Sequence, residues 1–161
     1  MHFPIICIEN MATPKEYWHE PDREDFCLNK HIDYYGEQYS AEERKDVITS
    51  GWLERLFDGI ATVDSDAETL TFKDAKTIRF TIQDWFTDET ERLHKMAVAG
   101  RLNAFDLRTA GEEFRGCLTL FYNCMEDTGC CYGLTSMDFV EDAKYFAGKT
   151  VAIGNIFDAH I

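Results

Sequence analysis

The sequence predicts an α+β domain in which three or four helices pack against a mainly antiparallel sheet. Three observations support this fold class: helical spacing of apolar residues in residues 40–58, alternation of apolar and polar residues in residues 60–82, and short apolar runs toward both ends. The chain has 161 residues, of which 45% are hydrophobic. One domain spanning residues 1–161 can therefore bury a sizeable core.

The first elements are a strand, an irregular segment and a helix. Residues 3–8 are rich in Ile and Phe, which predicts a short buried strand. Residues 10–39 combine two prolines, many acids and no clean period, so we expect a long irregular or short-helical insertion there. Ser40 and Glu43 form the sequence pattern of a capping box. Apolar residues follow at helical spacing up to Gly59, and together these signals predict a helix. Gly51 lies inside it, so we expect either a kink there or another backbone packed close to it.

The spacing of apolar residues changes to a period of two between residues 60 and 82. Three short runs alternate in this way, which predicts an antiparallel meander of three strands with turns at residues 64–67 and 73–76. Thr87 then precedes a turn that is rich in acids, and bases follow in the later turns. This order of charges matches the dipole of a helix, so we expect a second helix that begins at Thr87 and ends near Gly100.

The last third of the chain alternates between helical and extended patterns. Residues 103–115 fit either a helix or a short strand, and we favour the helix. Residues 117–123 predict a strand, and residues 136–147 predict a third amphipathic helix because their apolar residues recur at helical spacing. Residues 150–156 predict a final strand.

The charge of the chain limits the classes of partner. It contains 16 Lys and Arg against 30 Asp and Glu, which gives a formal net charge of −14 at pH 7. A field this negative repels nucleic acid and anionic membrane surfaces, so we expect neither as a direct ligand. The apolar runs are shorter than a membrane-spanning helix, and the first residues do not resemble a signal peptide. We therefore expect a cytoplasmic location, with the cysteines as reduced thiols.

Cysteine and histidine residues are the candidates for a metal site. Four cysteines fall in one segment: Cys117, Cys124, Cys130 and Cys131. Structural zinc sites use close pairs of ligands, which this spacing does not provide. His19, Cys27 and His31 are a second candidate set, but the motifs of zinc enzymes and of nucleophilic hydrolases are absent. We expect no cofactor, and the alternative function is a small metal-dependent enzyme or regulator that uses these ligands.

Acidic residues are concentrated in residues 54–91, which contain ten acids and four bases. Many of these acids fall in expected turns or at an expected helix start, so we expect them to be exposed and to form one or two negative patches. The candidate partner-binding residues are these acids and two tyrosines: Asp64, Asp66, Glu68, Asp84, Asp88, Glu89, Glu91, Tyr34 and Tyr35. Carboxylates can substitute for phosphate charge, and aromatic side chains supply rigid contacts at interfaces.

These observations favour a small acidic interaction protein without catalytic activity. This is the leading hypothesis, with a basic protein as the expected partner. One form of it is an inhibitor that occupies the nucleic-acid-binding groove of its target in place of DNA. A second copy of the chain is a further partner that the aromatic residues allow.

Overall fold

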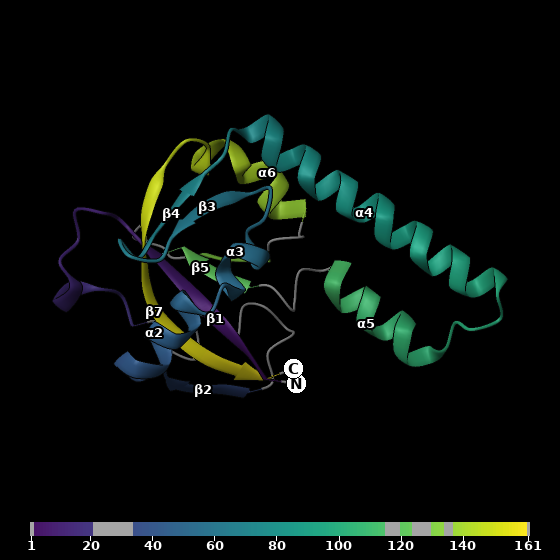
Figure 1. The fold of residues 1–161 in the computed structure, drawn as a ribbon, viewed down its shortest axis with the longest axis horizontal. Helices are drawn as coiled ribbons and strands as arrows, with labels where there is room; N and C mark the ends of the chain where they lie inside the picture. The colour runs from purple at the N-terminus through teal and green to yellow at the C-terminus, as the bar shows by residue number, and fades with distance from the viewer. Residues whose placement is uncertain (1, 21–33, 115–119, 124–129, 134–136, 161) are drawn as a thin grey trace.

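The computed structural model of the chain describes residues 2–20, 34–114, 120–123, 130–133 and 137–160 (Figure 1). Its elements in these ranges are, in chain order, β1 (His2–Glu9), the 3₁₀-helix η1 (Lys15–Tyr17), β2 (Tyr34–Gln38), α2 (Ala41–Thr49), α3 (Trp52–Leu56), β3 (Ala61–Asp64), β4 (Thr69–Phe72), α4 (Ala75–Val98), α5 (Ala104–Phe114), β5 (Leu120–Asn123), β6 (Cys130–Gly133), α6 (Met137–Phe146) and β7 (Thr150–His160). The predicted α+β class is confirmed.

Strand β7 lies at the centre of the sheet. It pairs with β1 along one side, and on the other side it pairs with β4 near its start and with β2 near its end. The described strands follow the order β3-β4-β7-β1-β5-β6, with β2 also beside β7. Only β1 and β5 are parallel among these pairs, so the prediction of a mainly antiparallel sheet is confirmed.

Most of the predicted strands are present. The strands expected at residues 3–8 and 150–156 are β1 and β7, and β7 continues to His160. The strand expected at residues 117–123 is described from Leu120 onward as β5. Two strands were not predicted: β6, and β2 at the end of the segment expected to be irregular.

The helix predicted from Ser40 begins as expected but is divided. The Ser40 hydroxyl accepts from the Glu43 N–H, and the Glu43 carboxylate accepts from the Ser40 N–H, which completes the capping box. The helix then breaks at Gly51, which adopts φ of 73° and separates α2 from α3. Gly51 was expected to mark a kink or a close backbone approach, and it divides the helix because a left-handed residue cannot continue a right-handed helix.

The prediction of a third strand at residues 77–82 was wrong. These residues form the first part of α4. The turn predicted at residues 73–76 is instead the start of that helix, because the Asp74 carboxylate accepts from the N–H groups of Lys76 and Thr77. Thr87 therefore lies inside the helix, where its hydroxyl donates to the Gln83 carbonyl, and does not cap it. The helix ends beside Gly100, as predicted.

The main core lies between one face of the sheet and four helices. Its largest side chains are aromatic, and the Phe72 ring lies 5.2 Å from the Phe146 ring and 6.3 Å from the Phe57 ring. Helices α2, α3 and α6 and the first part of α4 contribute buried residues to it, among them Ile78 and Ile82 of α4. Strand β1 also buries Ile5 on its opposite face, so both faces of the central sheet are covered.

The outer part of α4 projects away from the sheet. Figure 1 shows α4 running beyond the sheet and α5 returning beside it. The only buried side chains of α4 are Ile78 and Ile82, both in its first third. Residues 87–98 together with α5 are called the helical arm below. The arm exposes large apolar side chains, including Val98, Phe105 and Leu107.

Candidate functional site

The acids of the β3–β4 turn shape that turn and remain exposed. The Asp64 carboxylate accepts from the N–H groups of Asp66 and Ala67, at 3.1 and 2.9 Å. This arrangement is an Asx turn, which explains why an aspartate stands at the end of β3. The carboxylates of Asp64 and Asp66 are on the surface, and neither forms an ion pair with a residue that the structure describes.

Glu68, in contrast, is neutralised by two bases. Its carboxylate lies 2.9 Å from the Lys15 ammonium and 2.9 Å from the Arg44 guanidinium. Burial alone raises the pKa of the Glu68 carboxyl, but the hydrogen bonds and positive charges of Lys15 and Arg44 outweigh that effect and lower the pKa. Glu68 therefore contributes little free negative charge to a partner.

Replacement of Glu68 with glutamine tests this ion-pair cluster. Because its folded-state pKa is lowered, the carboxylate stabilises the fold above its ordinary value of 4.5, and that stabilisation is lost as pH falls through the folded pKa. We expect Glu68→Gln to lower the free energy of unfolding by up to about 1 kcal/mol at neutral pH, since the group is partly exposed. Urea unfolding of both proteins, repeated down to acid pH, should show the difference shrinking below that value. A difference that stays constant with pH would contradict this account.

The acids of α4 divide into paired and unpaired residues. Two nitrogens of the Arg92 guanidinium donate to the Glu89 carboxylate, and the Lys95 ammonium lies 3.0 Å from that of Glu91. Asp84 and Asp88 are exposed and form no ion pair within the described ranges. They are four positions apart on a helix, so they lie on one side at successive turns, about 6 Å apart along the axis.

The nine candidate residues do not share one surface. The β3–β4 turn and the outer part of α4 lie at opposite sides of the molecule, as Figure 1 shows. Tyr34 and Tyr35 belong to β2, where they pair with His160 and Ala159 of β7, and Figure 1 places that strand at the lower edge of the view, away from α4. The acids of α4 are therefore a candidate site that is separate from the turn and from the tyrosines.

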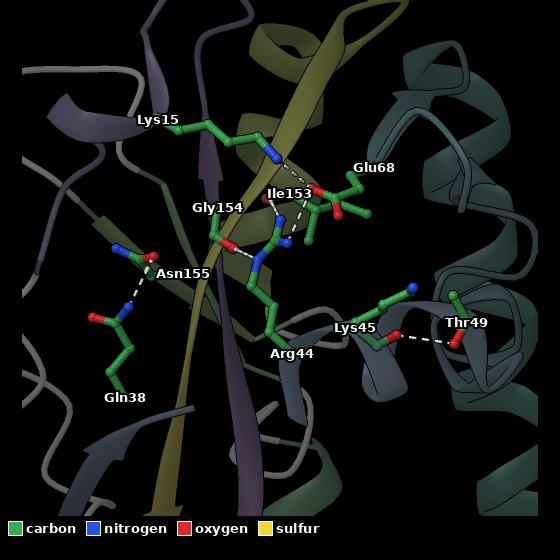
Figure 2. Close-up of polar contacts among 9 residues, drawn as sticks. All are labelled: Lys15, Gln38, Arg44, Lys45, Thr49, Glu68, Ile153, Gly154 and Asn155. Carbon is green, nitrogen blue, oxygen red and sulfur yellow. Dashed lines mark hydrogen bonds and ion pairs between the residues drawn. The ribbon is translucent and has the colours of Figure 1, made fainter. Parts of the chain in front are cut away.

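Arg44 donates hydrogen bonds to backbone carbonyls at the edge of β7, and sequence reasoning did not identify it. Its Nε donates to the Gly154 carbonyl at 2.7 Å, and its two terminal nitrogens donate to the Ile153 carbonyl and the Glu68 carboxylate (Figure 2). Strand β4 pairs with β7 up to Ala152, and β2 pairs with it from Phe157 onward. The guanidinium therefore supplies donors where β7 has no strand partner on that side.

Residues 15–19, which follow β1, contact the edge of β7 that Arg44 binds. The Trp18 ring lies 5.2 Å from the Arg44 guanidinium and 5.3 Å from the Lys15 ammonium, distances typical of cation–π contacts. The His19 N–H donates to the carboxylate of Glu9, which is only 2% exposed. The Asn155 side-chain amide donates to the His19 carbonyl. These contacts explain how a segment without a regular period holds a defined position.

The candidate metal ligands are only partly within the described structure. No group of three or more His, Cys, Asp or Glu side chains that could hold a metal ion occurs among the described residues. His19 is exposed, whereas Cys27, His31, Cys117 and Cys124 lie outside the described ranges. Cys130 and Cys131 belong to β6. The metal-dependent alternative stays a hypothesis.

Among the described residues, no helix is both long enough and apolar enough to cross a membrane. Known protein families, curated proteins and solved structures were also compared with the chain, and none matches it.

Proposed function

We propose that the protein is an acidic, non-catalytic interaction protein that binds a basic partner through the acids of α4. The observation that carries the proposal is the pair Asp84 and Asp88, exposed and without an ion-pair partner among the described residues, on a helix that projects from the sheet. Unpaired carboxylates at successive turns attract a basic surface and guide its approach.

The favoured partner is a nucleic-acid-binding protein. Its groove is lined by Lys and Arg that normally contact phosphates, and carboxylates spaced along a helix can occupy the same positions. The net charge of −14 supports such an encounter at long range. Exposed apolar side chains of the helical arm, such as Phe105 and Leu107, supply the contacts that hold the complex after encounter. The proposal includes a cytoplasmic location, where such partners act.

Reversal of the two α4 charges tests the proposal. The immobilised protein is incubated with a nuclease-treated extract of its source cells, and retained proteins are identified by mass spectrometry. We expect retention of a basic nucleic-acid-binding protein, displacement of that protein by double-stranded DNA, and a loss of at least about tenfold in retention between about 0.05 and 0.2 M salt. The variant Asp84→Lys/Asp88→Lys should abolish retention.

The matched control is Glu42→Lys/Asp46→Lys. These acids are also exposed, four positions apart on a helix, and their reversal changes the net charge by the same amount. We expect this control to retain the partner as the wild type does. Equal losses in both variants would mean that total charge, and not α4, determines binding. Retention that does not depend on salt would reject the electrostatic mechanism.

A further inference from the structure

An open groove of about 650 Å³ lies along one side of α4. Five described residues line it: Phe86, Thr87, Thr90, Glu91 and His94. The exposed surface of the groove is mostly apolar, with the Glu91 carboxylate as its one acidic group among these residues. Its volume is within the range of sites that bind small molecules or short peptide segments, about 300 to 1,000 Å³.

The helical spacing places a second carboxylate beside the groove. Asp84, Thr87, Glu91 and His94 recur at intervals of three and four, so they form one stripe along α4. Asp84 therefore lies on the same side of α4 as Thr87 and Glu91, which line the groove. With a rise of 1.5 Å per residue, Asp84 and Glu91 are about 10 Å apart along the helix axis. The groove thus combines a mostly apolar surface with the Glu91 carboxylate, and Asp84 stands about one turn beyond its described lining on the same stripe.

We propose that this groove binds an arginine-bearing segment of the basic partner, an inference that rests on the proposed function. The aliphatic part of arginine packs against the Phe86 ring and the threonine methyl groups, while its guanidinium reaches Glu91 or Asp84. The Lys95 ammonium already pairs with Glu91, but both side chains are mostly exposed. Exposed pairs of this kind contribute little stability, so an incoming guanidinium can replace the ammonium.

The preference for arginine over lysine follows from the same chemistry. A guanidinium stacks on an aromatic ring and binds a carboxylate through two hydrogen bonds, whereas an ammonium is a compact, strongly hydrated charge. The protein itself uses this combination at the edge of β7, where Arg44 lies over Trp18 and pairs with Glu68. In the groove, Phe86 corresponds to the ring and Glu91 to the carboxylate.

Calorimetric titration with hexa-arginine and hexa-lysine peptides tests the proposal. We expect hexa-arginine to bind at least about threefold more tightly than hexa-lysine. Phe86→Ala should weaken hexa-arginine binding about tenfold, and Glu91→Gln about fivefold. Phe80→Ala, which removes an exposed aromatic ring elsewhere on α4, and Glu42→Gln should leave the affinity within about twofold of the wild type.

Two further measurements separate the outcomes. Because Phe86 is half-buried, circular dichroism checks that Phe86→Ala is folded, and the exposed Glu91→Gln tests the groove independently. In the wild type, hexa-arginine should shift the backbone amide resonances of residues 84–95. If neither Phe86→Ala nor Glu91→Gln weakens peptide binding while Asp84→Lys/Asp88→Lys still abolishes partner retention, the groove proposal is wrong and the proposed function stands. If the wild type retains no basic partner at all, the proposed function itself fails.

Discussion

Replacement of Arg44 with methionine is expected to lower the free energy of unfolding by about 3 kcal/mol. Methionine keeps the length and packing of the side chain but donates no hydrogen bond. The carbonyls of Ile153 and Gly154 then lose their side-chain donor at the edge of β7, and Glu68 keeps only Lys15. A polar group left unsatisfied in a buried position costs about 1 to 3 kcal/mol. The Arg44 side chain is 12% exposed, so water replaces these bonds poorly.

The matched control for Arg44→Met is Lys45→Met, on the same helix. It removes the same charge from an exposed side chain for which no ion pair is described, so we expect a change within about 0.5 kcal/mol. Urea unfolding monitored by circular dichroism measures both variants. Hydrogen exchange should also show faster exchange at the Ile153 amide in Arg44→Met. Similar stabilities for the two variants would show that the guanidinium does not hold the edge of β7.

Replacement of Gly59 with alanine is expected to lower the free energy of unfolding by about 3 kcal/mol. Two effects add at this position. Gly59 has φ of 72°, a conformation that costs about 1 to 2 kcal/mol for a residue with a Cβ atom. A Cβ atom would also lie 2.6 Å from the Thr81 Cγ2 and 2.7 Å from its Oγ1, and that hydroxyl now donates to the Gly59 carbonyl. The contact joins α4 to the residues that precede β3.

Three further variants separate the backbone effect from the steric effect. Gly100 has φ of 65° but would place no atom within 4 Å of a new Cβ, so Gly100→Ala should lose only about 1 kcal/mol. Thr81→Ala removes the clashing groups, so the double variant Gly59→Ala/Thr81→Ala should lose less stability than the two single changes added together. Thermal or urea unfolding provides all four values. Strict additivity would mean that Gly59 and Thr81 are not in the contact described.

Local signals in the sequence predicted the elements that local interactions stabilise. The capping box at Ser40 was correct because its two hydrogen bonds join residues only three positions apart. The error at residues 77–82 arose because alternating apolar residues and β-branched threonines favour a strand. Ile78, Ile82 and Phe86 also fall four positions apart, which fits a helix. The Asp74 cap and the burial of Ile78 and Ile82 decide between these patterns in favour of the helix.

The candidate site was predictable only in part, because only some of its contacts join residues that are close in the sequence. Residue spacing fixes the pairs Glu89–Arg92 and Glu91–Lys95 once the helix is known, so two of the predicted acids could have been recognised as paired. The contacts of Arg44 could not be recognised in this way, because Arg44 and Gly154 are 110 positions apart in the sequence. Such a contact depends on how β7 lies between β4 and β2, and no local pattern encodes that arrangement.

The position of β7 also constrains when the chain can acquire its structure during synthesis. Strands β1, β2 and β4 are all translated before residue 150, yet each has an edge whose described strand partner is β7. Until the ribosome has released residues 150–160, these strands expose unsatisfied edges that can pair with other chains. The helices of the arm form through local contacts and have no such delay. The sheet is therefore completed only after its central strand has been translated.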